Sequence, residues 1–215
     1  KLLLLENASS RYAQASFLPL NARWHAMSFP EIEKSRNMIE NVLPGFQKYA
    51  LLLASENLRE FLPIVLQALS TSRNGKSLGL IVIGAAGQQD VEFARGFAAV
   101  MGTGKNLAFY NASIANEAER GIACAADILL ISNSSGVELL QALACSVGCE
   151  SNGLSGPIVI ASAENQLGID LIKNGVNGFR IPFNASIEGI DLLANAFDLS
   201  LQDMRLHSQV SKGAF

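Results

Sequence analysis

The chain has 215 residues, a net charge of −3, only 16% charged residues and a positive mean hydropathy. This length is sufficient for one large α/β domain with a full core. The acidic balance argues against nucleic-acid binding, and no apolar run approaches the roughly 18 residues that a membrane span needs. The low charge predicts a surface that packs against another domain or subunit, so we expect a homo- or hetero-oligomer or a partner domain.

Cysteine and histidine usage gives no sign of a disulfide framework or of a catalytic centre. The chain has three cysteines, Cys124, Cys145 and Cys149, and such a low, odd count favours a reducing, cytoplasmic location. Cys145 and Cys149 have the spacing of a helical metal pair, but no third ligand lies at a suitable distance in the sequence. His25 and His207 lie in no recognisable nucleophile motif. We therefore expect no metal site and assign no catalytic residue.

The chain begins with Lys1 rather than Met, and we expect a fragment or a processed chain. Two short apolar runs, residues 1–6 and 15–20, are interpreted as strands at a domain edge. Residues 1–29 are expected to form the segment that meets a partner domain, and residues 30–215 the folded domain. Pro30 suits the first position of a helix that runs to about Val42.

Strands and helices then alternate. Continuous apolar runs predict six strands at residues 49–55, 78–84, 106–111, 127–132, 157–162 and 178–183. Apolar residues at helical spacing predict helices at residues 57–70, 88–101, 116–125, 136–147, 166–173, 186–197 and 201–211. Because the strands lack alternation, both faces of the sheet should be covered. The expected fold is a Rossmann-like three-layer α/β/α domain with a parallel sheet of about six strands.

Two glycine-containing turns are candidates for ligand loops. The sequence from Gly84 to Gly87 (GAAG) follows a strand and precedes a helix, but it lacks both the GxGxxG spacing and a Walker lysine. It is therefore interpreted as an ordinary βα turn. The run at residues 174–178 (NGVNG) is interpreted as a helix stop and turn, in which Gly175 and Gly178 meet backbone requirements.

The stretch at residues 125–149 is the most informative. Its strand feeds a helix through a polar turn, and such a helix N-terminus directs free N–H groups at the sheet edge where α/β proteins bind ligands, often phosphates. Together with LLLLE at residues 2–6, ASENLREFLPIVLQAL at 54–69, SGVELLQAL at 135–143 and DLSLQDMRLH at 198–207, it resembles the motifs of trehalose-6-phosphate synthases. Pro63 falls on the family's proline. LIKNGVNGFRIP at residues 171–182 is similar to the wider family-4 type of GT-B glycosyltransferase.

The resemblance implies the C-terminal, nucleotide-sugar-binding half of a GT-B fold, with UDP-glucose or another nucleotide sugar as donor and no other cofactor. In the family an Arg and a Lys grip the donor diphosphate, and the matching positions here are Ser55 and Glu60. Each lost charge-assisted hydrogen bond is worth roughly 1.5–3 kcal/mol. Arg59 is adjacent to Glu60, but a one-residue shift turns a helical side chain by about 100°.

The second half of the implied donor site has changed as well. The family's acidic residue before the glycine becomes Ser135, and its ribose-binding Glu becomes Leu143. Its Asn becomes Glu138, whose carboxylate repels a phosphate. The backbone N–H groups of Gly136, Val137 and Glu138 remain. Under a family-4 alignment the two acidic positions become Asn133 and Gln141 instead.

The candidate donor contacts are therefore Ser55, Arg59, Ser135, Gly136, Val137 and Glu138. The resemblance implies a trehalose-6-phosphate synthase-like domain that has lost most donor-site residues. We expect this domain to act as a regulatory or non-catalytic subunit. The N-terminal GT-B domain is expected to be absent from this chain. One alternative is an active retaining transferase domain that binds a UDP- or GDP-sugar. The other is a Rossmann-like binding module unrelated to sugars.

Overall fold

The computed structural model describes residues 29–53, 58–84, 86–111, 117–132, 156–164 and 171–202. The strands predicted at residues 1–6 and 15–20, the helix at 136–147 and most of the helix at 166–173 lie outside these residues. Cys145, Cys149 and both histidines also lie outside them.

The described helices and strands follow the predicted alternation closely. The helices are α2 (Phe29–Val42), α3 (Leu58–Thr71), α4 (Gln88–Val100), α5 (Glu117–Ala125) and α8 (Ile187–Gln202), with short 3₁₀ turns η1 (Gly75–Ser77) and η2 (Gly104–Asn106). The strands are β1 (Lys48–Leu53), β2 (Leu78–Ile83), β3 (Leu107–Tyr110), β4 (Ile128–Ile131), β5 (Ile158–Ser162) and β6 (Phe179–Ile181).

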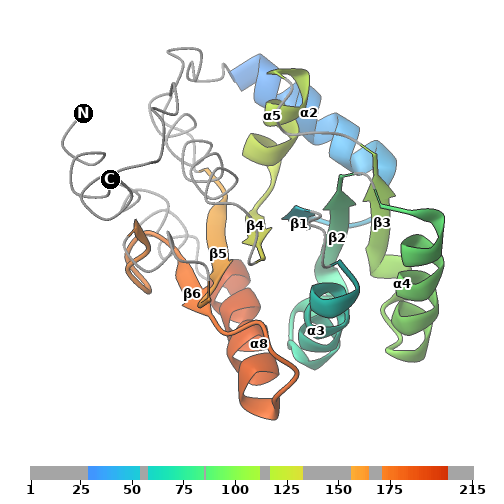
Figure 1. Ribbon diagram of the computed structural model, residues 1–215. Coiled ribbons are helices and arrows are strands. Elements are labelled where there is room, and N and C mark those ends of the chain that lie inside the picture. The colour runs from blue at the N-terminus through green and yellow to red at the C-terminus, as the bar shows by residue number, and fades with distance from the viewer. Residues whose placement is uncertain are drawn as a thin grey trace, which may run out of the picture.

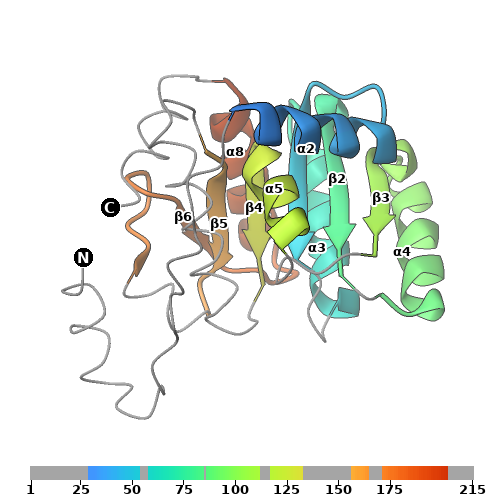
Figure 2. The same ribbon diagram turned by 90° about the horizontal axis from the view of Figure 1, so that it is seen from above.

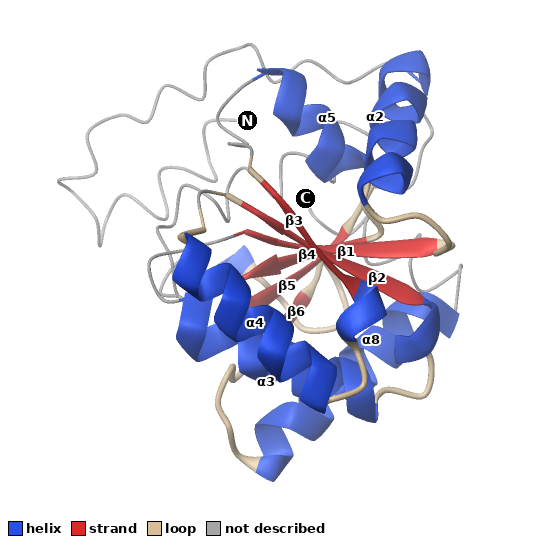
Figure 3. Cartoon of the chain, turned by 90° about the vertical axis from the view of Figure 1, so that its right-hand side faces the viewer, coloured by secondary structure: helices blue, strands red, loops and turns tan. Residues whose placement is uncertain are grey.

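These strands form one six-stranded parallel sheet in the order β3-β2-β1-β4-β5-β6. Helices α2 and α5 cover one face, whereas α3, α4 and α8 cover the other (Figures 1 and 3). Seen from above, the strands lie side by side between these two helical layers (Figure 2). The predicted Rossmann-like three-layer α/β/α fold is confirmed.

Burial of the strands explains why their sequences are continuously apolar. Every residue of β2, β4 and β5 is buried, whereas the edge strands β3 and β6 are largely half-buried. One apolar cluster lies on the α3, α4 and α8 side of the sheet and a second on the α2 and α5 side. Each fully buried Leu or Ile side chain contributes roughly 1.5–3 kcal/mol to stability. Strands with alternating polar and apolar residues would lose this contribution on one face of the sheet, and with it one of the two clusters.

The C-terminal helix differs from the prediction. Residues 186–197 and 201–211 were expected to be two helices, but α8 continues through Asp198 and Ser200 to Gln202. Asp198 and Ser200 are residue types that favour helix caps. Here the Asp198 carboxylate instead accepts hydrogen bonds from another segment, the loop after α3, so the helix is not interrupted.

Helix α4 buries a narrower face than its sequence predicts. The helical spacing of Val91, Phe93, Ala94, Phe97 and Val100 predicts that these residues share an apolar side, but Phe93 is 43% exposed and Val100 is 85% exposed. The buried residues of α4 are Ala94 and Ala98, with Phe97 packed partly against the core. Because α4 flanks the edge of the sheet, its contact with the core is limited to these two alanines and part of Phe97.

Among the described helices, none is both long enough and apolar enough to pass through a bilayer.

Candidate functional site

The candidate site lies at the carboxyl edge of the sheet. Helix α3 starts there after β1, and α4 starts there after β2. From β1 the chain moves outward to β2 and β3, and it returns to the other side of β1 to form β4. The boundary between β1 and β4 is therefore a topological switch point, the place where open α/β sheets bind ligands.

Most of the predicted donor contacts lie outside the described residues. Ser55 falls in the gap between β1 and α3, and Ser135, Gly136, Val137 and Glu138 follow the last described residue after β4. That residue, Ser132, is 1% exposed at the switch-point end of β4. The roles of Ser55 and of residues 135–138 as donor contacts therefore stay predictions.

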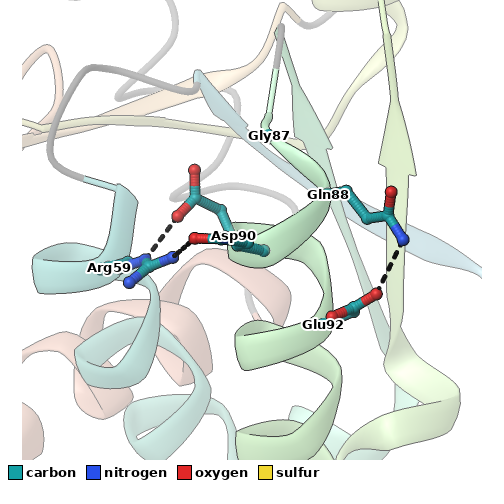
Figure 4. Close-up of a pocket in the computed structure, with 6 residues that line it drawn as sticks. Arg59, Gly87, Gln88, Asp90 and Glu92 are labelled. Atoms are coloured by element: carbon teal, nitrogen blue, oxygen red, sulfur yellow. Dashed lines mark hydrogen bonds and ion pairs between the residues drawn. The ribbon is translucent and has the colours of Figure 1, made fainter.

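Arg59 is the predicted site residue that the structure describes, and its side chain turns toward α4. Its Nε lies 2.5 Å from Oδ1 of Asp90, and its Nη2 lies 3.5 Å from Oε1 of Gln89. Figure 4 shows Arg59 paired with α4. The guanidinium also lies 5.9 Å from the centre of the Phe93 ring. Arg59 thus connects α3 to the strand β2 side of the sheet, away from the switch point.

The first turn of α3 carries two further features that bear on the site. Glu60 is exposed, and it is the acidic residue of this first turn. Pro63 lies within α3 and has no N–H to donate to the carbonyl of Arg59. The described part of this turn therefore presents one guanidinium that is already paired and one carboxylate.

A shallow hollow of about 600 Å³ lies beside the Arg59–Asp90 pair. Its lining is polar and comprises Arg59, Gly87, Gln88, Gln89, Asp90 and Glu92. Nε2 of Gln88 donates to Oε1 of Glu92 at 2.9 Å, on the far side of the α4 turn from Arg59 (Figure 4). The lining residues of the hollow come from the first turns of α3 and α4 and from Gly87, which precedes α4.

The turn from Gly84 to Gly87 behaves as an ordinary strand-to-helix connection in its described residues. Gly84 has a φ of +135°, which an L side chain rarely adopts, and its N–H donates to the Tyr110 carbonyl at 3.1 Å. Gly87 is the N-cap of α4, with extended backbone and no side-chain cap. The interpretation of GAAG as a βα turn is consistent with this geometry.

The interpretation of NGVNG as a turn that depends on the backbone freedom of its glycines is confirmed. Gly175 has a φ of +73° and Gly178 a φ of +153°. Oδ1 of Asn174 accepts from the Arg180 N–H at 2.5 Å, and Asn177 bonds the Lys173 N–H and the Leu171 carbonyl. These amide side chains fold the turn against the start of β6, at the edge of the sheet opposite to the candidate site.

The carboxyl end of β5 adds a small polar group. Ser162 is fully buried, and its Oγ accepts a hydrogen bond from the Glu164 N–H at 3.3 Å. The Ala163 N–H donates to the Ile181 carbonyl at 2.8 Å, which ties this turn to β6. Within the described residues, no group of three or more His, Cys, Asp or Glu side chains is arranged to hold a metal ion.

A buried carboxylate at the opposite, amino edge serves the fold. Asp127 accepts from Nη1 of Arg36 at 2.8 Å, from Nζ of Lys48 at 2.7 Å and from the Tyr49 N–H at 2.9 Å. Burial raises the pKa of Tyr49, the negative charge of Glu40 adds to that shift, and the neutral phenol donates to the Leu43 carbonyl at 2.9 Å. The network joins α2, β1 and β4.

A second buried carboxylate joins α8 to the loop after α3. Asp198 accepts from the Ser72 hydroxyl at 2.8 Å, from the Asn74 N–H at 3.0 Å and from the Arg73 N–H at 3.2 Å. Burial alone would raise the pKa of this carboxyl, but the donors at Asn74, Ser72 and Arg73 outweigh it and hold the pKa of Asp198 below its usual value. This carboxylate is structural as well.

Sequence reasoning did not identify Asp90 as part of the site. An acidic residue in the first turn of α4 is common because it complements the helix dipole. Its contact with Arg59 joins residues 31 positions apart, on two different helices. No local pattern in the sequence indicates that pairing.

Comparison with known proteins was informative only at the level of structure. No protein-family model matches the chain, and no curated protein matches it. Solved structures do match. HepE of Anabaena in complex with UDP and glucose superposes with a TM-score of 0.69 at 17% identity, covering 89% of this chain and 48% of that one. The C-terminal domain of the glycosyl transferase group 1 family protein LpcC from Francisella tularensis gives 0.64 at 16% identity, over 89% and 91%.

The chain has the fold of a GT-B glycosyltransferase C-terminal domain. Sucrose-phosphate synthase from Thermosynechococcus elongatus gives a TM-score of 0.65 at 18% identity, and the match covers 99% of this chain and 50% of that one. The chain thus spans about half the length of HepE and of this synthase, and most of the isolated LpcC domain.

Proposed function

We propose that this chain is a donor-type, nucleotide-sugar-binding domain of a GT-B glycosyltransferase-like protein, with weakened donor binding. The fold supports the proposal, as does the switch point between β1 and β4. HepE, which has a similar fold, is known in complexes with UDP and with UDP-glucose. Within this class we propose a trehalose-6-phosphate synthase-like domain with a regulatory or non-catalytic role.

The observation that carries the proposal of weak binding is the direction of Arg59. Its guanidinium pairs with Asp90 on α4 instead of standing free at the switch point, and Glu60 adds a negative charge to the same turn. The resemblance aligns Ser55 and Glu60 with the two cations that contact the donor diphosphate in the family. Loss of two such charge-assisted contacts costs about 3–6 kcal/mol, or roughly a hundredfold or more in Kd. Transfer chemistry depends on holding and stabilising that leaving group, so turnover should suffer with it.

The test is a titration of UDP and of UDP-glucose into the folded 215-residue chain. We expect UDP binding with a Kd of about 1 mM or weaker, because a donor Kd of about 10 μM that is weakened a hundredfold or more reaches that range. Micromolar binding of UDP would contradict the weakened site and favour an active retaining transferase domain. Binding of an unrelated nucleotide in preference to UDP would favour a module that has no connection with sugars.

The proposal extends to domain organisation. We propose that residues 1–29 form the segment that meets a second, N-terminal GT-B domain in the complete protein, and that residues 30–215 form the donor-type domain. The half-length coverage of HepE and of the sucrose-phosphate synthase supports a two-domain arrangement. We further propose that a regulatory subunit of this kind acts in the cytoplasm through association with other subunits, which suits the low charge of the chain.

A further inference from the structure

Arg59 occupies a special place among the cations of the chain. Of the cationic side chains that the structure describes, it is the one in the first turn of a helix at the carboxyl edge of the sheet. Lys48 lies at the amino edge, where it pairs with Asp127. A diphosphate bound at the carboxyl edge needs a positive partner, and an arginine offers two parallel N–H donors to phosphate oxygens.

Two side chains on α4 hold this guanidinium, and a third lies beneath it. Asp90 accepts from Nε at 2.5 Å, Oε1 of Gln89 lies 3.5 Å from Nη2, and Cζ of Arg59 lies over the Phe93 ring at 5.9 Å from its centre. Figure 4 shows the Asp90 carboxylate directed at Arg59, whereas Glu92 is directed at Gln88. Asp90 therefore supplies the charge that fixes the direction of Arg59, and Glu92 does not.

The pair is weak enough to exchange. The side chains of Arg59 and Asp90 are 54% and 33% exposed, so water screens their attraction. Exposed ion pairs of this kind are worth about 0.2–1 kcal/mol. A diphosphate carries more charge than one carboxylate, and Arg59 can leave Asp90 without repacking a core, because α4 buries Ala94 and Ala98 and not Asp90.

We infer that Asp90 sets the affinity of this chain for a nucleoside diphosphate, because it competes with the diphosphate for Arg59. The inference rests on the proposed donor-binding function. It identifies Asp90 as a positioning residue: it acts through Arg59 and does not touch the ligand. In the absence of ligand, the ion pair with Asp90 therefore occupies Arg59, a cation at the carboxyl edge of the sheet where the diphosphate of the donor would bind.

The central experiment compares UDP binding to the wild-type chain and to Asp90→Asn by NMR titration at fixed salt. Release of Arg59 should tighten UDP binding about 1.4- to fivefold, which is the exposed-pair energy of about 0.2–1 kcal/mol converted at 1.4 kcal/mol per tenfold. Asp90→Ser serves as a second variant, because serine is also compatible with a first helical turn. Thermal unfolding of each variant checks that the fold persists.

The matched control is Glu92→Gln, which removes one negative charge from the same hollow without touching Arg59. It should leave UDP affinity unchanged if the effect passes through Arg59. Arg59→Ala should weaken UDP binding, because it removes the guanidinium that the diphosphate takes over from Asp90. In Arg59→Ala with Asp90→Asn, the gain of the Asp90 variant should disappear, which a double-mutant cycle measures directly.

The outcomes separate this inference from the proposed function. If the wild-type chain and Asp90→Asn bind UDP with equal affinity, the role of Asp90 is overturned and the donor-binding proposal is unaffected. An equal gain in Glu92→Gln also overturns it, because the effect would then be a general reduction of negative charge. If no folded variant binds UDP at a UDP concentration tenfold above the expected Kd of about 1 mM, both the role of Asp90 and the donor-binding proposal are overturned.

Discussion

Gly178 is the residue whose replacement tests the backbone geometry most directly. It has a φ of +153°, and a Cβ added there would lie 2.6 Å from the Val159 carbonyl oxygen of the neighbouring strand. We expect Gly178→Ala to lower the free energy of unfolding by about 2 kcal/mol or more, because strained backbone and a backbone clash coincide. Urea unfolding at neutral pH measures the loss.

A second glycine provides the matched control at the same scale. Gly96 lies inside α4, and a Cβ added there meets no atom within 4 Å. Gly96→Ala should therefore raise the free energy of unfolding by about 0.5–1 kcal/mol, since alanine loses less backbone entropy in a helix. A change of the same sign in both variants would contradict the geometry described for Gly178.

At the scale of elements, Asp198 decides how α8 is attached to the loop after α3. Asp198→Asn should lower stability at pH 7 by about 1.5–3 kcal/mol, because the donors at Ser72, Arg73 and Asn74 lose a charged acceptor. Since the folded pKa lies below the unfolded value of about 3.9, this contribution is fully present above pH 4 and is lost as pH falls through the folded pKa.

The measurement is urea unfolding of the wild-type chain and of Asp198→Asn between pH 7 and pH 3. The stability difference between them isolates this carboxyl, because all other titrating groups are common to both. It should narrow at the acidic end. A difference that stays constant or widens toward pH 3 would show that the Asp198 carboxylate is not preferentially stabilised in the folded chain.

Whether the sequence could predict an element depended on whether local or tertiary forces formed it. Continuous apolar runs such as those of β2 and β4 identified buried parallel strands, because covering both faces leaves no polar positions. The helix end expected near Asp198 was wrong because its carboxylate has a partner 124 residues away in Asn74. The same limit applies to the site: Arg59 was identified, but its pairing with Asp90 is a contact between helices.

At the scale of the whole molecule, Asp127 connects both halves of the sheet to the α2 layer. Asp127→Ala should lower the free energy of unfolding by about 3 kcal/mol, because Arg36 and the Tyr49 N–H lose a buried partner. Lys48→Met is the control and should cost less than about 1 kcal/mol, because Lys48 is 42% exposed. Chemical denaturation ranks the two, and equal losses would contradict a central role for the carboxylate.

The central position of β1 also has a consequence for how the chain is made. One edge of β1 pairs with β2, but its other edge waits for β4, and the bond from the Tyr49 N–H to Asp127 spans 78 residues. Until the ribosome has released β4, the nascent sheet presents an apolar strand with unpaired backbone groups, a template for association with other chains. We therefore expect an aggregation-prone stage during synthesis, which ends when Ile128–Ile131 pairs with β1.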